Sequence, residues 1–143
     1  MPSRAAAALE RVRTLCLAYP ETSERISHGA PTFFVREKRS FVTFHDDHHG
    51  DGRLALWCAA PPGAQAMLVE ANADAYFVPA YVGHLGWIGV RLDRGLPWPE
   101  IAAVIEHAYQ MRAPKRRAAS AGRAEPRAAA KAASTPRRRA GPR

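Results

Sequence analysis

Cysteine and long apolar runs are scarce in this sequence, and each scarcity excludes a class of protein. The 143 residues include two cysteines, Cys16 and Cys58, which are too few for a disulfide framework or a four-cysteine zinc site. We expect both to be buried thiols in a reducing compartment. The longest unbroken apolar run, residues 54–60, is too short to span a bilayer, and charges interrupt the alanine-rich start where a signal peptide needs an apolar core. The protein is therefore expected to be cytoplasmic, with no membrane partner.

Aromatic and acidic residues are almost absent from the last part of the chain. All 12 aromatic residues lie before residue 113. Residues 113–143, called the basic segment below, contain 10 Lys and Arg against 1 acidic residue, a net charge of +9. Residues 1–112 contain 11 against 12, a net charge of −1, so the two parts account for the overall +8. Because the basic segment lacks the apolar side chains of a core, we predict one folded domain, residues 1–112, followed by a disordered tail, residues 113–143.

Hydrophobic periodicity within residues 1–112 predicts helices interspersed with short strands. Apolar residues at steps of three and four predict helices at residues 4–19, 64–71 and 97–112. Runs rich in β-branched and aromatic residues predict strands at residues 24–27, 32–35, 40–45, 53–58, 76–78 and 87–92. The first four strands follow one another too closely for parallel crossovers. We predict an α+β fold, a two-layer sandwich in which one antiparallel sheet carries its helices on one face.

Three stretches of the predicted domain resemble the MmcQ/YjbR family of small single-domain proteins. They are residues 28–35 (HGAPTFFV), 39–42 (RSFV) and 81–91 (YVGHLGWIGVR), within a resemblance that extends over residues 5–112. The resemblance implies a two-layer sandwich often compared with the frataxin fold, and DNA binding through a proposed double-wing surface. Some members carry the name phosphoribosylglycinamide formyltransferase, but this sequence has no glycine loop before a helix that would hold a phosphate. The resemblance supplies no catalytic residues and no cofactor, so we expect a protein that is not an enzyme.

The basic segment is predicted to bind nucleic acid through its charge. Its clustered cations are Lys115, Arg116, Arg117, Arg123, Arg127, Lys131, Arg137, Arg138 and Arg139. A flexible polycation gains affinity for DNA or RNA by releasing condensed counterions, with a salt slope of about −8 if nine phosphates are neutralised. Phosphate contacts carry no base information, so we expect non-specific binding and a nucleoid-associated protein. The alternative is a solubilising tail with no nucleic-acid role.

A second candidate site is the sheet face that the helices leave uncovered. Side chains alternate along a strand, so residues 53–58 and 87–92 each have an aliphatic side. If those sides face the helices, the opposite face carries Arg53, Trp57, Trp87 and Arg91. Tryptophans flanked by arginines can stack on bases and hold phosphates. They are equally suited to a homodimer interface, or to a core covered by loops.

A third candidate is a cluster of imidazoles and carboxylates in the turn that follows residue 45. Its weak candidates for metal ligands are His45, Asp47, His48 and His49. Asp and Gly also belong in such a turn for backbone reasons, so we predict a polar turn and no metal site.

The leading hypothesis is therefore a non-specific DNA-binding protein whose basic segment supplies the phosphate contacts. One alternative is a module that binds a protein or a small ligand, with an incidental basic segment. The other is a metal-assisted enzyme that uses the residues from His45 to His49.

Overall fold

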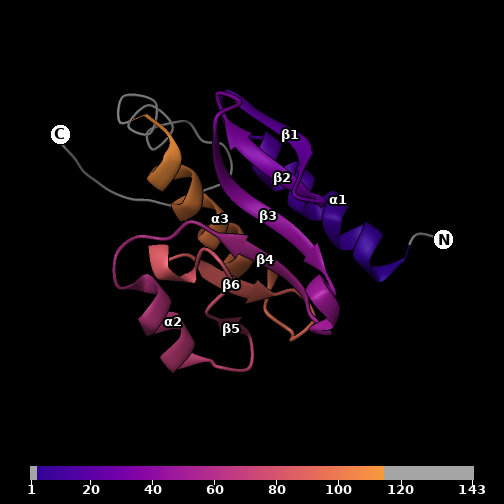
Figure 1. Cartoon of the computed structure of the whole chain (residues 1–143), viewed down its shortest axis with the longest axis vertical. Coiled ribbons are helices and arrows are strands. Elements are labelled where there is room, and N and C mark those ends of the chain that lie inside the picture. Colours follow the sequence, from indigo (N-terminus) through magenta and orange to yellow (C-terminus); the bar gives the residue numbers. More distant parts are fainter. Residues whose placement is uncertain (1–2, 115–143) are drawn as a thin grey trace. The chain divides into compact units, whose positions relative to one another are not determined.

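The structure, a computed structural model, describes residues 3–114. The described residues form three α-helices, six β-strands and two short 3₁₀ turns (Figure 1). In chain order these are α1 (Arg4–Leu17), β1 (Thr22–Ser27), β2 (Ala30–Val35), β3 (Arg39–Asp46), η1 (His48–Gly50), β4 (Leu54–Cys58), α2 (Ala64–Ala71), β5 (Tyr76–Phe77), η2 (Gly83–Leu85), β6 (Ile88–Arg91) and α3 (Trp98–Arg112). The predicted disordered tail, apart from its first two residues, lies outside the described residues.

The six strands form one antiparallel sheet in the order β1-β2-β3-β4-β6-β5. Strands β1 to β4 are neighbours along the chain and in the sheet, as their close spacing predicts. The predicted α+β class and the order of helices and strands are confirmed. Boundaries shift by a few residues: β4 begins at Leu54 and β6 spans Ile88–Arg91, so Arg53 and Trp87 lie just outside the strands.

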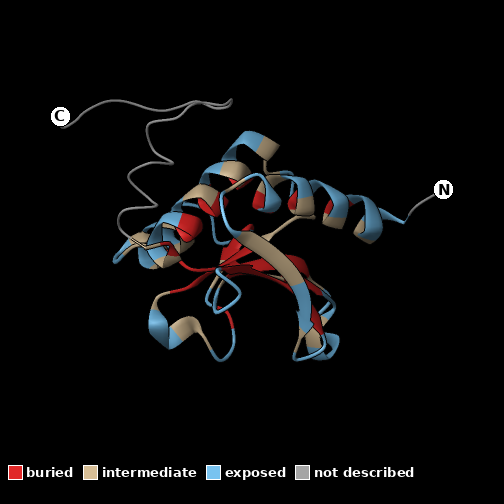
Figure 2. Ribbon diagram, turned by 90° about the horizontal axis from the view of Figure 1, so that it is seen from above, coloured by how far each residue is buried: buried red, intermediate tan, exposed pale blue. Residues whose placement is uncertain are grey.

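Helices α1 and α3 cover one face of the sheet (Figure 2). The side chain of Ser3 caps α1 by accepting a hydrogen bond from the Ala6 N–H at 3.0 Å. Helix α3 buries the apolar stripe that predicts it, namely Ile101, Val104, Ile105, Ala108 and Tyr109. Cys16 and Cys58 are both buried and free, as predicted, and burial raises the pKa of both thiols. No helix among residues 3–114 is long and apolar enough to cross a membrane.

One irregularity in the sheet changes which side chains meet. The register of β2 and β3 breaks between Phe33 and Phe34, because β3 contains one additional residue there. Phe41, at this bulge, is fully buried, and its ring packs edge-on against Tyr109 of α3 with ring centroids 5.7 Å apart. A bulge inserts a residue that strict alternation does not predict. Phe41 therefore joins the layer between the sheet and α3.

Helix α2 lies beside β5, at the edge of the sheet, and buries none of its residues completely. Its contact with the chain between β5 and β6 is polar. The side-chain amide of Gln65 donates hydrogen bonds to the carbonyl oxygens of Gly83 at 2.8 Å and Trp87 at 2.6 Å. A single glutamine thus ties α2 to the loop that leads into β6.

Candidate functional site on the open face of the sheet

The face opposite α1 and α3, called the open face below, carries a row with one residue from every strand. Residues directly opposite each other in an antiparallel pair point to the same side. The register aligns Arg25, Thr32, Thr43, Trp57, Gly89 and Phe77. Five spacings between strands make the row about 24 Å long. Trp57 stands near its middle, and the buried Leu56 and Cys58 on either side of it point to the helices.

Arginines lie over aromatic rings near both ends of this row. The guanidinium carbon of Arg25 lies 3.7 Å from the centroid of the Phe34 ring. That of Arg53 lies 4.1 Å from the centroid of the Phe77 ring. Neither arginine forms an ion pair with a carboxylate among residues 3–114. Stacking on a ring holds a guanidinium in place and leaves its N–H groups free to bind an anion.

The Phe77 ring explains why β6 contains a glycine at the same level. A Cβ atom on Gly89 would lie 2.4 Å from the nearest carbon atoms of the Phe77 ring. Real Cβ atoms do not approach a ring that closely, so any other residue would displace Phe77 and with it the stacked Arg53. Glycine in a strand commonly marks such a close approach.

Trp57 is covered by a group of other rings. The centroid of His45 lies 3.8 Å from that of Trp57, the centroid of His48 4.8 Å and the centroid of Tyr81 6.4 Å. Only 7% of Trp57 is exposed. The sequence allows a base-stacking surface, a homodimer interface or a core covered by loops, and the last of these describes Trp57 best. A base can stack on this ring only if the Tyr81 and His48 side chains move.

His45 is the most perturbed histidine in this group. It is 8% exposed, and its Nε2 atom is buried without a hydrogen-bond partner among the described residues. The pKa of His45 is lowered from 6.5 to about 4, chiefly by burial and also by the neighbouring His48, while Asp51 acts in the opposite direction. His45 is therefore neutral at pH 7.

Arg91 and Trp87, the other two predicted residues of this surface, are already engaged by the fold. Arg91 is on the open face beside Ala55, but its Nε and Nη2 atoms donate to the Asp93 carboxylate at 3.0 and 3.2 Å. Burial would raise the pKa of Asp93, but the bond and charge of Arg91 outweigh it and hold the pKa below its usual range. Trp87 is 7% exposed and lies against Arg112 of α3. The structure thus places Arg53 and Trp57 in or beside one row, Arg91 next to it, and Trp87 apart.

Arg25 is a further residue of this surface that was not predicted from the sequence. Its signal is the alternation along β1, in which Ser23, Arg25 and Ser27 share a side. That signal becomes useful only once β1 is known to be the edge strand next to β2.

The candidate metal ligands do not converge on one point. Asp47 has a positive φ of 63° and its carboxylate accepts a hydrogen bond from the Gly52 N–H at 2.7 Å, so it stabilises the turn itself. His48 and His49 contact each other ring to ring, with centroids 4.1 Å apart. Among residues 3–114, no three His, Cys, Asp or Glu side chains are arranged to hold a metal ion.

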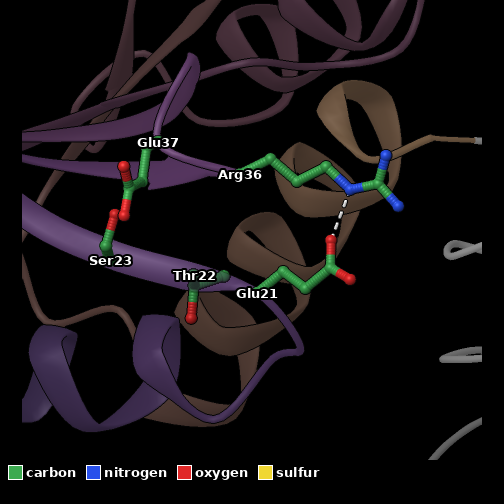
Figure 3. Close-up of a pocket in the computed structure, with 5 residues that line it drawn as sticks. All are labelled: Glu21, Thr22, Ser23, Arg36 and Glu37. Carbon is green, nitrogen blue, oxygen red and sulfur yellow. Dashed lines mark hydrogen bonds and ion pairs between the residues drawn. The ribbon is translucent and has the colours of Figure 1, made fainter.

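A hollow of about 320 Å³ lies at the β1 edge (Figure 3). It is lined by Glu21, Thr22, Ser23, Arg36 and Glu37. The Arg36 side chain crosses to Glu21 and forms an ion pair with it, while the Glu37 carboxylate points toward Ser23. With its cation already paired and a second carboxylate in its wall, the hollow is poorly suited to an anion.

Comparison with known proteins identifies the domain that carries these features. The YjbR family model matches residues 17–111, about two thirds of the chain and the whole sheet. The chain belongs to the YjbR family. The resemblance expected from residues 28–35, 39–42 and 81–91 is therefore confirmed. The basic segment lies beyond the part of the chain that matches the YjbR family.

The YjbR domain also has a solved structural neighbour. The crystal structure of Deinococcus radiodurans protein DR2400, described as a DUF419 domain, superimposes with a TM-score of 0.62 at 18% sequence identity. The match covers 72% of this chain and 76% of that chain. At this identity the likeness shows the fold alone. Among curated proteins, none matches this YjbR family member.

Proposed function

We propose that this YjbR family member is a non-specific DNA-binding protein whose basic segment supplies most of the affinity. The observation that carries the proposal is the separation of charge: a net of −1 over residues 1–112 and +9 over residues 113–143. A polycationic chain binds phosphates mainly by releasing the counterions condensed on DNA, and this does not depend on base sequence.

The ion pairs of the domain support a larger contribution to DNA affinity from the basic segment than from the domain. Four arginines of residues 3–114 are bound to carboxylates of the same domain: Arg13, Arg36, Arg91 and Arg94. An arginine that is already paired must break that pair before it can bind a phosphate. The seven other Lys and Arg residues of the domain, among them Arg25 and Arg53 on the open face, form no ion pair within residues 3–114. Seven acidic residues of the domain are likewise unpaired there, so the domain offers no excess of positive charge.

The test compares two triple variants of the full chain. Fluorescence anisotropy of a labelled 20-base-pair duplex is measured from 50 to 200 mM salt. In R137Q/R138Q/R139Q, removal of three phosphate contacts is expected to reduce the magnitude of the salt slope by about 3. The matched control, R4Q/R11Q/R94Q, removes three exposed arginines from the domain and is expected to keep a slope close to that of the native protein.

Two results would contradict the proposal. One is the absence of binding by the native chain at 50 mM salt. The other is an equal loss of slope in the two triple variants, which would assign the affinity to total charge rather than to the basic segment. A second duplex of unrelated sequence is expected to bind equally well, because phosphate contacts do not distinguish bases.

A second candidate function, association between two copies of this chain, has one observation in its favour. Four large apolar side chains around α2 and the β5–β6 connection are between 56% and 71% exposed: Met67, Val78, Tyr81 and Leu85. Exposed apolar side chains that gather on one surface often mark an interface. Sedimentation equilibrium is expected to show a dimer that M67S/L85S weakens and that I26S, on the β1 edge, leaves unchanged. A monomer at all concentrations would exclude this candidate.

A further inference from the structure

Arg112, the last residue of α3, is held in a fixed orientation by the domain. Its Nε atom donates a hydrogen bond to the Ser40 carbonyl oxygen at 2.9 Å. Its guanidinium carbon lies 6.0 Å from the centroid of the Trp87 ring. Within residues 3–114 its two Nη groups have no hydrogen-bond partner. A guanidinium fixed through Nε and a ring face keeps these two Nη groups available, and loses little entropy when it binds an anion.

A second arginine, Arg39, precedes the residue to which Arg112 is bonded, and within residues 3–114 no carboxylate forms an ion pair with either arginine. Arg39 precedes Ser40 in the chain and is exposed. Because Arg112 is hydrogen-bonded to the backbone of Ser40, the residue that follows Arg39, the two arginines belong to the same small region of the domain. Burial lowers the pKa of Arg112, and the positive charge of Arg39 acts in the same direction. Neither forms an ion pair with another of the described residues, whereas Arg13, Arg36, Arg91 and Arg94 all do. An anion bound between the two arginines would offset their like charges.

We propose that Arg39 and Arg112 form a binding site for a single phosphate group. Resting on the proposed function, the site takes a backbone phosphate of the DNA that the basic segment binds. Arginine suits this role because its planar fork presents two parallel N–H donors to phosphate oxygens. Lys115, the first cation of the basic segment, follows Arg112 by three residues in the sequence.

The test uses the full chain and three single substitutions in the same anisotropy measurement. R39Q is expected to weaken binding and to reduce the magnitude of the salt slope by about 1, because one phosphate contact is lost. R112K keeps the charge but loses the fork and the bond to Ser40, so binding is expected to weaken roughly tenfold with little change in slope. R11Q is the matched control, because Arg11 also lies over a tryptophan, 4.7 Å from the Trp98 ring centroid. Its affinity is expected to equal that of the native protein.

The outcomes separate this site from the proposed function. If R39Q and R112K bind as the native chain does while R137Q/R138Q/R139Q loses slope, the arginine pair is not a phosphate site and the proposed function stands. If the native chain does not bind the duplex, the proposed function fails, and the site is tested with inorganic phosphate by NMR of the arginine Nε–Hε groups. A saturable shift of the Arg112 signal that R39Q abolishes supports the site. An unmoved signal overturns it.

Discussion

Replacing Tyr109 by alanine is expected to lower the free energy of unfolding by about 4 kcal/mol, because a large buried ring is removed and a cavity remains. The Tyr109 ring is fully buried, stacks on Tyr19 with centroids 4.6 Å apart and meets Phe41 edge-on. Its hydroxyl donates a hydrogen bond to the Pro20 carbonyl oxygen at 3.0 Å. This bond joins α3 to the segment between α1 and β1. Urea denaturation followed by circular dichroism measures the loss.

Two further variants separate the contribution of the ring from that of the hydroxyl. Y109F keeps the ring and loses one hydrogen bond, so a loss of about 1 kcal/mol is expected. Y81A applies the alanine substitution to a tyrosine that is 71% exposed, and its cost is expected to stay below about 1 kcal/mol. Equal losses in Y109A and Y81A would show that Tyr109 does not anchor α3 on the sheet.

Protonation of His45 is expected to destabilise the domain as the pH falls from 6.5 to 4. The pKa of His45 is about 4 in the folded protein and 6.5 in its ordinary state. Between these values the unfolded chain binds more protons than the folded one, so stability is fully present above pH 6.5 and is lost as the pH falls toward 4. By pH 4 this difference in pKa corresponds to a loss of about 3 kcal/mol from the free energy of unfolding.

The variant H45F isolates this contribution because it keeps a ring beside Trp57 and removes the titrating group. The free energy of unfolding is measured by urea denaturation at pH 7, 5.5 and 4. The native protein is expected to lose about 2 to 3 kcal/mol more than H45F over this range. H107Q removes an exposed imidazole from α3 and serves as the matched control. Parallel pH profiles for H45F and the native protein would show that burial of His45 does not govern acid stability.

The helices and strands could be predicted because their signals are local. The stripe from Ile101 to Tyr109 repeats at the helical period, and each position of that stripe is buried in α3. Ser3 caps α1, and serine is among the residue types that most often cap a helix N-terminus. The close spacing of β1 to β4 excludes parallel crossovers, so the antiparallel order follows from distances along the chain.

The candidate site was less predictable because its contacts join residues far apart in the sequence. Alternation places Arg53, Trp57 and Arg91 on one face, but it does not show that Tyr81 and His48 cover Trp57 or that Asp93 binds Arg91. The Arg112 bond to Ser40 spans 72 positions. Nothing in the sequence around Arg112 or Ser40 indicates this hydrogen bond.

The element order, the burial of both cysteines and the concentration of positive charge after residue 112 all follow from the amino-acid sequence. Periodicity and composition are properties of neighbouring residues, so they can be interpreted without coordinates. Which arginines of residues 3–114 are paired with carboxylates depends instead on the packing of the domain. Arg91 is paired with Asp93, Arg25 and Arg53 lie over aromatic rings, and Arg112 is bonded to Ser40 with no ion pair within residues 3–114. Those differences depend on strand register, on the bulge at Phe41 and on where α3 ends, and the packing of the whole domain sets all three.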